Sequence, residues 1–457
     1  MSIIIPANSA VAGGYDVDNS VRFNNSEYLQ RTNGTATDDK KYSLSFWVKR
    51  SKLGEDDRIF NNQYDGSNWG YLMFKSDNTI RIADRQAGTD RIDWITTQVF
   101  RDISAWYHFY LAIDTTQGTA DNRVKFYVNG TQVTSFTKNA SPSLNNALGF
   151  QQATATNLAR IATADGGGNL FSGYMSEIVF IDGTQNAVTD FGEFDEDSGI
   201  FKPIDVSGLT FGDNGYYLNF QDSAELGTDV SGESNTYTEV NLTAIDQTTD
   251  TCTNNFATGN ILSPYANRTI SDGNLTITST TTQWTNICST IGVSSGKWWI
   301  ELKHTAGSYG GFGIVSPFPQ TENNVIGDFS APVVQQIGYV AASGDKKINN
   351  STSSYGSTWV GTGDIVNMSL NLDDNELKFY KNGTVQDSGT AIAISSGYTY
   401  FVGTSNYNSS GSSFNFGNPA FSISSGNADA NGYGNFEYAP PAGFLALCTK
   451  NLSGELS

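Results

Sequence analysis

The sequence predicts an all-β protein built from two antiparallel β-sandwiches in tandem. Two distant segments share one pattern: residues 111–130 are LAIDTTQGTADNRVKFYVNG, and residues 370–383 are LNLDDNELKFYKNG. In each, an alternating strand ends in Asp, a polar turn leads to a second strand, and Asn-Gly follows. Asn-Gly between alternating strands predicts a type I′ hairpin, because both residues accept the positive φ of that turn. The repeat therefore predicts two β domains of related design.

Composition supports the same fold class. Gly (47), Tyr (22) and Phe (27) are abundant, whereas Met (4) is rare and charged residues make up only 16%. Aromatic strands joined by Gly- and Asn-rich turns explain this mixture. For 457 residues, a prior of roughly 150 residues per domain predicts two or three units. We expect an N-terminal docking segment at 1–14, a sandwich at 15–185, a packed irregular connector at 186–269, a second sandwich at 270–422 and a C-terminal docking tail at 423–457.

The net charge and the cysteines limit which partners and which redox environment we expect for the protein. A net charge of −20 argues against nucleic acid or an anionic membrane as a partner, because phosphate would be repelled. The cysteines Cys252, Cys288 and Cys448 are odd in number and widely spaced, so we expect no disulfide framework, no zinc site and a reducing place of synthesis. The start MSIIIPANSA lacks the basic region of a signal peptide. No apolar run approaches the roughly 20 residues that cross a bilayer, so membrane insertion is not expected.

The first block alternates strands and turns. In YSLSFWVKR, residues 42–50, Leu44, Phe46 and Val48 lie on one face. SFWVKR, WYHFYLAID, VKFYVNG and FSGYMSEIVFIDG resemble the successive strands of a laminin-G or concanavalin A-like jellyroll. This resemblance implies two antiparallel sheets packed face to face. The segment from about residue 190 to 260 has few regular strands and is too long for a bare linker.

The second block contains GKWWIELKH, YGGFGIVS, QQIGYVAASGDKKIN, WVGTGDIVNMSLNLDDNELKFYKNG and FNFGNPAF. In order and in kind these strands resemble a SPRY (B30.2-like) sandwich, which is also concanavalin A-like. The whole arrangement, with IPANSA at the start and PPAGFLALCTKNL at the end, resembles virion proteins of marine tailed bacteriophages. This resemblance implies assembly in the host cytoplasm, a place on the virion and other virion proteins as partners.

The sequence contains no convincing group of catalytic residues. His108 and His304 lie inside aromatic strands, where packing is the usual role, and no nucleophile elbow accompanies them. Glu193, Asp195 and Asp197 have the even spacing that two glycosidase carboxylates need on one strand face. Their Gly- and Ser-flanked context is a loop, which disfavours that role. We therefore expect no enzyme.

Calcium is the one cofactor that the sequence leaves open. Asp114 and Asp121 lie in the long turn of the first hairpin, and Asp165 stands beside three glycines. Carboxylate and carbonyl oxygens in such turns can bind Ca²⁺, as in laminin-G-like domains. Turn aspartates more often cap their own backbone amides.

Exposed aromatic and amide side chains are candidates for glycan binding. The segment QYDGSNWGY and the strand RIDWIT carry them. Aromatic, Asn and Gly residues on rigid loops are typical of recognition surfaces. The alternative is that these aromatics only cover the sandwich. The candidates are Tyr64, Asn68, Trp69, Tyr71 and Trp94.

These observations predict a non-enzymatic phage virion surface protein, a tail-fibre or adhesion component that binds host-surface glycans. Two alternatives stay open: a capsid decoration or head-fibre structural protein, and a polysaccharide depolymerase that uses Glu193 and Asp195. Fold alone does not decide among them.

Both chain ends are apolar, although free termini are normally polar. We expect them to be buried in a homo-oligomer, with a trimer favoured, or docked on their own chain. The interface candidates are Ile3, Ile4, Ile5, Phe444, Leu445 and Leu447.

Overall fold

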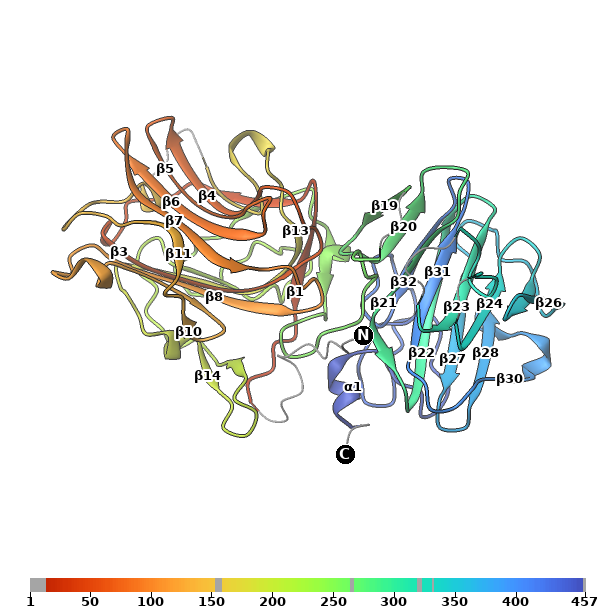
Figure 1. Cartoon of the computed structure of the whole chain (residues 1–457). Helices are drawn as coiled ribbons and strands as arrows, with labels where there is room; N and C mark the ends of the chain where they lie inside the picture. Colours follow the sequence, from red (N-terminus) through yellow and green to blue (C-terminus); the bar gives the residue numbers. More distant parts are fainter. Residues whose placement is uncertain (1–13, 153–157, 264–266, 319–322, 331–332, 455–457) are drawn as a thin grey trace. The chain divides into compact units, whose positions relative to one another are not determined.

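The computed structural model describes residues 14–152, 158–263, 267–318, 323–330 and 333–454. The chain divides into two compact units between Thr253 and Asn254, and Figure 1 shows that each consists of layered strands. Helix within the described ranges is limited to short segments, none long and apolar enough to cross a bilayer. The predicted all-β fold is confirmed. The helical segments are α1 (Thr449–Gly454) and the 3₁₀ turns η1 (Ala120–Asn122), η2 (Gly149–Gln151), η3 (Asp165–Gly167), η4 (Val188–Asp190), η5 (Ala244–Asp246) and η6 (Asp387–Gly389).

Two antiparallel sheets form the first unit, and we name them after a central strand. The β3 sheet has the order β10 (Thr131–Gln132), β9 (Val124–Val128), β8 (Trp106–Asp114), β3 (Lys41–Arg50), β13 (Ser172–Asp182), β1 (Ser20–Asn24) and β18 (Gln247–Thr248), with β16 (Tyr216–Leu218) paired to β13. The β5 sheet has the order β11 (Phe136–Ala140), β7 (Thr89–Val99), β6 (Thr79–Gln86), β5 (Asn68–Phe74), β4 (Asp57–Asp65), β12 (Ala159–Ile161), β2 (Tyr28–Arg31) and β17 (Thr238–Val240). A separate ribbon pairs β14 (Gly192–Phe194) with β15 (Phe201–Pro203).

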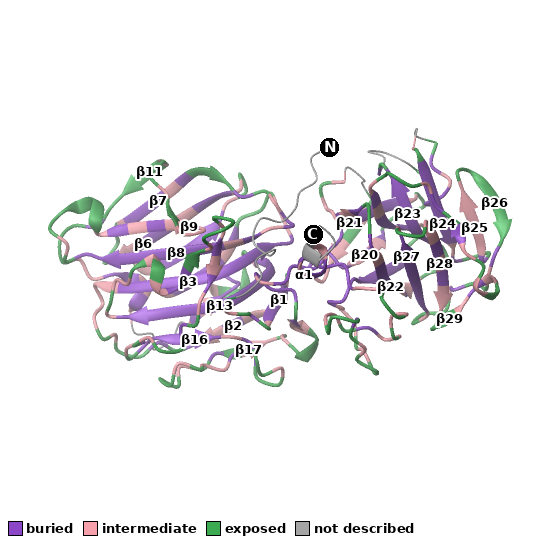
Figure 2. Cartoon of the chain, turned by 90° about the horizontal axis from the view of Figure 1, so that it is seen from below, coloured by how far each residue is buried: buried purple, intermediate pink, exposed green. Residues whose placement is uncertain are grey.

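The main core of the first unit lies between these two sheets. Leu44, Phe46 and Val48 point into it from β3 and are fully buried, as the alternation predicts. Leu72 and Phe74 fill it from β5. In Figure 2, β3 and β13 are buried along nearly their whole length. A sheet strand is buried on both faces only when a second layer covers its outer face.

Residues 186–253 supply that second layer. They belong to the region 186–269 that was expected to be a packed, irregular connector, but they contribute β16 and β18 to the β3 sheet and β17 to the β5 sheet. Their aromatic side chains pack on the outer face of the β3 sheet; Phe201, for example, stacks on Trp47. The first unit therefore extends to Thr253, beyond the expected boundary at residue 185.

A buried ion pair links the covering segment, residues 186–253, to the β3 sheet. Lys49 on β3 and Asp250 are 1% and 0% exposed, and the Lys49 Nζ lies 2.7 Å from Asp250 Oδ2. The Trp106 Nε1–H donates to the other carboxylate oxygen at 3.1 Å. Burial lowers the pKa of Lys49, and the Asp250 charge opposes that shift. The pair is one place where the covering segment and the sheet depend on each other.

The second unit is also a two-layer sandwich with its own core. Trp298, Ile300 and Leu302 point into that core from β22. The β27 sheet has the order β19 (Arg268–Ser271), β20 (Thr276–Ser279), β32 (Gly411–Asn415), β22 (Lys297–Ala306), β27 (Ile365–Asn371), β28 (Glu376–Lys381) and β29 (Thr384–Val385), with β30 (Ile392–Ala393) paired to β28. The β23 sheet has the order β21 (Thr285–Val293), β31 (Tyr400–Asn406), β23 (Gly310–Ser316), β24 (Gln335–Val340), β25 (Asp345–Ile348) and β26 (Ser351–Ser354).

The repeated Asn-Gly hairpin has the predicted geometry in both units. Asn129 and Gly130 have φ of 47° and 75°, and Asn382 and Gly383 have φ of 48° and 76°. Positive φ at both positions defines a type I′ turn, which joins β9 to β10 and β28 to β29. The two units thus share the same local design at equivalent turns.

An aromatic ring covers the glycine of each hairpin. A Cβ at Gly130 would lie 2.3 Å from the Phe201 ring, and a Cβ at Gly383 would lie 2.5 Å from the Tyr438 ring. Phe201 belongs to residues 186–253, and Tyr438 belongs to the C-terminal tail. Glycine is therefore needed at both positions for close packing as well as for positive φ.

The tail docks on its own unit through Glu301, a fully buried residue of β22. Glu301 Oε1 accepts the Tyr438 N–H at 2.9 Å and the Asn367 Nδ2–H at 3.0 Å. Glu301 Oε2 accepts the Glu437 N–H at 3.0 Å and the Asn415 Nδ2–H at 2.9 Å. One carboxylate thus satisfies two backbone donors of the tail and two side chains of the sheet.

The C-terminal interface candidates pack within the second unit. Leu447 is 0% exposed and belongs to the main core, and Leu445 packs against the same core. Phe444 is half-buried among aromatic residues. This is the intramolecular docking that the sequence left open. Of these three residues, Phe444 and Leu445 keep some exposed surface and Leu447 is buried. The N-terminal candidates Ile3, Ile4 and Ile5 lie outside the described residues.

Candidate functional site: an aromatic and guanidinium face on the first unit

Two of the predicted glycan-binding residues share the outer face of the β5 sheet. Along β5, Leu72 and Phe74 enter the core, so Trp69, Tyr71 and Met73 point outward. The rings of Trp69 and Tyr71 stack with centroids 5.1 Å apart and an interplanar angle of 20°. We call this surface the Trp69–Tyr71 face.

Arginines from the adjacent strands cover these rings. The Arg58 guanidinium of β4 lies 3.3 Å from the Tyr71 centroid, and the Arg85 guanidinium of β6 lies 5.4 Å from the Trp69 centroid. Arg81, also on β6, lies 5.7 Å from the Tyr71 centroid. Such cation–π contacts hold the guanidinium groups in fixed positions. Tyr71 is consequently only 7% exposed, while Trp69 is partly exposed.

Charge is not balanced on this face. Arg81 makes two hydrogen bonds of 3.0 Å to Asp93, which Lys138 also contacts. Arg85 pairs with Asp90 at 2.6 Å. Among the described residues no carboxylate lies within 4.0 Å of Arg58, whose guanidinium makes a long hydrogen bond of 3.4 Å to Asn61 and also interacts with the Tyr71 side chain and, at longer range, with the charge of Asp56. Burial lowers the pKa of Arg58, although a guanidinium stays protonated in proteins.

The remaining glycan candidates do not join the ring pair. Asn68 lies at the start of β5, where its side chain binds Asp65 and the Ala87 N–H. Tyr64 is 36% exposed near the end of β4. Trp94 on β7 points into the core, where it is 8% exposed and packs against Phe136 with ring centroids 4.4 Å apart. Trp94 therefore lies on the opposite face of the sheet from Trp69.

The carboxylates considered for a depolymerase lie on the β14–β15 ribbon. Lys202 Nζ lies 3.3 Å from Glu193 Oε1 and 3.4 Å from Asp195 Oδ2. Hydrogen bonds from the Ser198 N–H and hydroxyl lower the pKa of Asp195. A general acid needs a raised pKa, whereas this environment favours the deprotonated form of Asp195. Asp197 is exposed in the adjoining turn.

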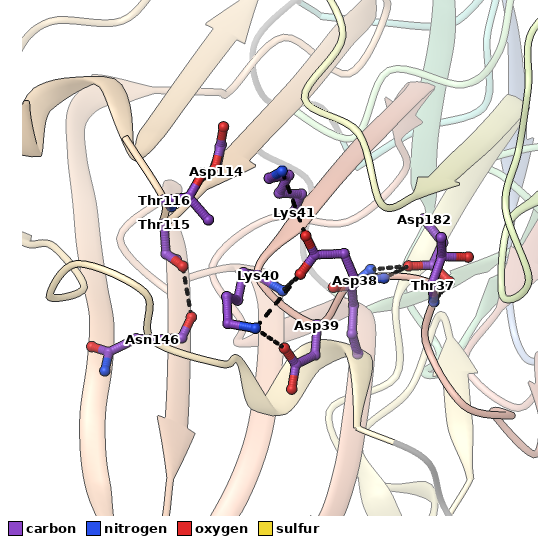
Figure 3. Close-up of polar contacts among 11 residues, drawn as sticks. Thr37, Asp38, Asp39, Lys40, Lys41, Asp114, Thr115, Thr116, Asn146 and Asp182 are labelled. Carbon is purple, nitrogen blue, oxygen red and sulfur yellow. Dashed lines mark hydrogen bonds and ion pairs between the residues drawn. The ribbon is translucent and has the colours of Figure 1, made fainter. Parts of the chain in front are cut away.

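Figure 3 shows the rim of the first unit around one calcium candidate, Asp114. Asp114 Oδ1 accepts the Thr116 N–H and hydroxyl, and Asp114 Oδ2 accepts the Gln117 Nε2–H at 2.7 Å. Nearby, Lys40 and Lys41 pair with Asp38. The rim carboxylates thus take their donors from their own chain.

The other calcium candidates have separate surroundings. Asp121 is exposed in η1, and Asp165 pairs with Arg160. The described residues contain no group of three or more His, Cys, Asp or Glu that could hold a metal, whereas Ca²⁺ takes six to eight oxygen ligands. Calcium binding stays a prediction, and it would require Asp114 or Asp165 to exchange its present contacts for metal ligands.

The two histidines are packed inside the units. His108 Nε2 lies 2.8 Å from Ser45 Oγ, and both residues are buried beneath the Phe201 ring. Burial lowers the pKa of His108 to about 3. His304 Nε2 lies 3.0 Å from the Gly307 carbonyl oxygen. The Ser45–His108 contact is closed to solvent by the layer over the β3 sheet.

Sequence reasoning missed Glu177, a buried acid at a β-bulge. Glu177 has φ of 49° where the pairing of β13 with β3 shifts register. The Tyr217 hydroxyl donates to Glu177 Oε2 at 2.6 Å, and Tyr15 contacts Tyr217 at 3.1 Å. Burial raises the pKa of Glu177 to about 7. Bulges redirect side chains, and this one places a carboxyl beneath the covering segment.

Glu177 is expected to make the stability of the first unit depend on pH. Its folded-state pKa of about 7 exceeds the ordinary value of 4.5, so the folded state binds the proton more tightly. The stabilisation is complete below pH 4.5 and is lost as the pH rises to about 7, by about 3 kcal/mol in total. Glu177→Gln should flatten this slope in urea unfolding followed at several pH values. Equal slopes for both proteins would contradict the expectation.

Comparison with known proteins finds that part of the first unit is similar to a fold superfamily. The model of the concanavalin A-like lectin/glucanase superfamily matches residues 23–187. No curated protein matches the chain in sequence. The fold prediction of concanavalin A-like sandwiches is therefore supported for the first unit by a family match as well as by its layered sheets.

Solved structures similar to the chain share little sequence with it. The SPRY domain of human HERC1 is 14% identical, with 34% of this chain and 96% of that chain covered and a TM-score of 0.28. A candidate carbohydrate-binding protein of Bacteroides ovatus is 15% identical, with coverage of 50% and 58% and a TM-score of 0.35. Domain 4 of the arabinanase AbnA from Geobacillus stearothermophilus, solved with arabinotriose, is 17% identical, with coverage of 40% and 82% and a TM-score of 0.29.

Proposed function

We propose that the chain is a non-catalytic glycan-binding protein on the surface of a tailed bacteriophage, in a tail fibre or adhesion structure. The glycan part is supported by the superfamily match of residues 23–187 and by the Trp69–Tyr71 face. The virion part is supported by the resemblance of the whole sequence arrangement to virion proteins of marine tailed bacteriophages. Host-surface glycans and other virion proteins are the partners that this function implies.

The observation that carries the glycan proposal is Arg58, whose guanidinium lies 3.3 Å from the Tyr71 ring centroid and which has no carboxylate within 4.0 Å among the described residues. A guanidinium group makes paired hydrogen bonds to carboxylate or sulfate oxygens. The partly exposed Trp69 ring beside it offers an apolar surface for the C–H face of a sugar. We therefore propose that this face binds acidic glycans, in which a charged substituent contacts Arg58 while a sugar ring packs on Trp69.

Binding of acidic and neutral oligosaccharides to the purified protein tests this proposal. Arg58→Gln and Trp69→Ala should each weaken acidic-glycan binding by about tenfold, because a charge-assisted contact or a stacking surface is lost. Added salt should weaken the wild type more than Arg58→Gln. Arg101→Gln, which removes an exposed arginine from the loop after β7, is the matched control. Unchanged binding in both site variants would refute the proposed site.

Antibody labelling of intact particles tests the place on the virion. Label on the tail together with glycan binding supports the adhesion role. Label confined to the head, with no binding to any host glycan, would favour the decoration or head-fibre alternative.

Native mass in solution tests the proposed homo-oligomer, for which a trimer is favoured.

A further inference from the structure

A second exposed aromatic cluster lies on the second unit, formed by Trp284, Tyr309 and Tyr407. The Tyr407 ring is central: its centroid lies 5.2 Å from that of Trp284 and 5.3 Å from that of Tyr309, at interplanar angles of 36° and 85°. Tyr309 is 41% exposed, and the other two rings are partly exposed. Trp284 also packs by one side on buried apolar residues.

Strand pairing explains why three residues so distant in sequence meet. In the order β21–β31–β23, Asn406 at the end of β31 pairs with Thr285 at the start of β21 and with Gly310 at the start of β23. Trp284, Tyr407 and Tyr309 are the residues just beyond these three positions. Neighbouring strands therefore present all three rings at the same end of the β23 sheet, whose strands are labelled in Figure 1.

Hydrogen bonds hold the loops that carry the rings. The fully buried Ser410 Oγ accepts the Ser308 N–H at 3.2 Å and the Tyr309 N–H at 3.0 Å. The Asn408 N–H donates to the Thr281 carbonyl at 3.0 Å, which joins two of the loops. Gly307 has φ of 81°, and a Cβ there would lie 2.2 Å from Ser410 Oγ. A site on such fixed loops loses little conformational entropy when a ligand binds.

The described residues of these loops carry no charge. They are TTTQW at 280–284, GSY at 307–309 and NYNSS at 406–410. Their side chains are hydroxyls, amides and aromatic rings, although the chain as a whole has a net charge of −20. Hydroxyl and amide groups both donate and accept hydrogen bonds, which matches sugar hydroxyls. A charged ligand would find no partner on these loops.

We propose that the Trp284–Tyr309–Tyr407 cluster is a second glycan site, which binds a neutral saccharide. A sugar ring packs its C–H face on the exposed rings, and the loop amides and hydroxyls bind its hydroxyl groups. The proposal rests on the proposed glycan-binding function but uses different residues, another unit and an uncharged ligand. The two sites would let one chain recognise acidic and neutral parts of a host polysaccharide.

The test measures binding of neutral hexose oligosaccharides to the full-length protein by calorimetry. Tyr309→Ala and Tyr407→Ala should each weaken neutral binding by about tenfold, while acidic-glycan binding stays unchanged. Trp284→Ala should also weaken neutral binding. Because the Trp284 ring packs on buried residues as well, the thermal unfolding of this variant must be recorded to detect a loss of stability. Tyr398→Ala, which removes another exposed tyrosine of the second unit, is the matched control and should bind normally.

Separate outcomes distinguish this proposal from the proposed function. Loss of neutral binding in Tyr309→Ala, with normal binding in Arg58→Gln, supports a second site. Loss of neutral binding in Arg58→Gln, with normal binding in Tyr309→Ala, places all glycan binding on the first unit and overturns the second site. Failure to bind any neutral oligosaccharide, together with a native mass that falls in Tyr309→Ala, overturns it in favour of a contact between copies of the chain.

Discussion

Glu301→Ala is expected to lower the free energy of unfolding of the second unit by about 4 kcal/mol. The substitution removes an acceptor from four donors: the part-buried Glu437 and Tyr438 N–H groups and the buried amides of Asn367 and Asn415, although the Asn415 amide keeps its bond to the Asn435 carbonyl. Because two of these donors belong to the tail, residues 423–457 should also become sensitive to protease. Urea unfolding at about pH 8 and timed proteolysis measure the two effects; burial raises the pKa of Glu301 to about 7.

Glu376→Ala provides the control for this substitution. Glu376 lies on β28 of the same sheet, and its side chain is 46% exposed. Its loss should change stability by no more than about 0.5 kcal/mol, as is usual for surface positions. A Glu301→Ala protein that unfolds at the wild-type urea concentration, with a protected tail, would show that the carboxylate does not hold the tail.

Lys49→Met is expected to destabilise the first unit by about 3–5 kcal/mol, because it leaves Asp250 buried without its cation. The double variant Lys49→Met/Asp250→Leu should recover part of this loss, because neither charge then remains buried. Urea unfolding of the single and double variants measures the coupling between the two side chains.

Lys52→Met is the matched control for the buried pair. Lys52 pairs with Glu55, which is 61% exposed, so its loss should have little effect. A double variant as unstable as Lys49→Met would contradict the proposed coupling and would point to packing of the lysine stem as the main contribution.

Local sequence signals predicted the sheets because the relevant interactions are close in sequence. The Asn129-Gly130 and Asn382-Gly383 turns follow from backbone preferences of two residues. The alternation of residues 42–50 predicted which side chains of β3 face the core. The strands of residues 186–253 were not predicted, because β15, β16 and β17 are three residues long and show too little alternation to detect.

The candidate sites were less predictable, because they depend on pairing between distant strands. Trp69 and Tyr71 were predicted, since they alternate on one strand, but Arg58 and Arg81 join them only through the pairing of β4, β5 and β6. Trp94 was expected among them, yet its parity on β7 turns it inward. Trp284 and Tyr309, the side chains that meet at Tyr407, lie about 100 positions or more before it in the sequence, so no linear motif could reveal the cluster.

The aromatic rings over Gly130 and Gly383 affect where the boundaries of expressed fragments of this protein should be placed. Each ring belongs to a segment that follows its sandwich in the chain and closes the outer face of a sheet. A fragment limited to the superfamily match, residues 23–187, would lack Phe201 and would leave Trp47 and Lys49 uncovered. Exposed apolar sheet faces promote aggregation. An expression boundary after Thr253 instead keeps the first sandwich together with the layer that covers its β3 sheet.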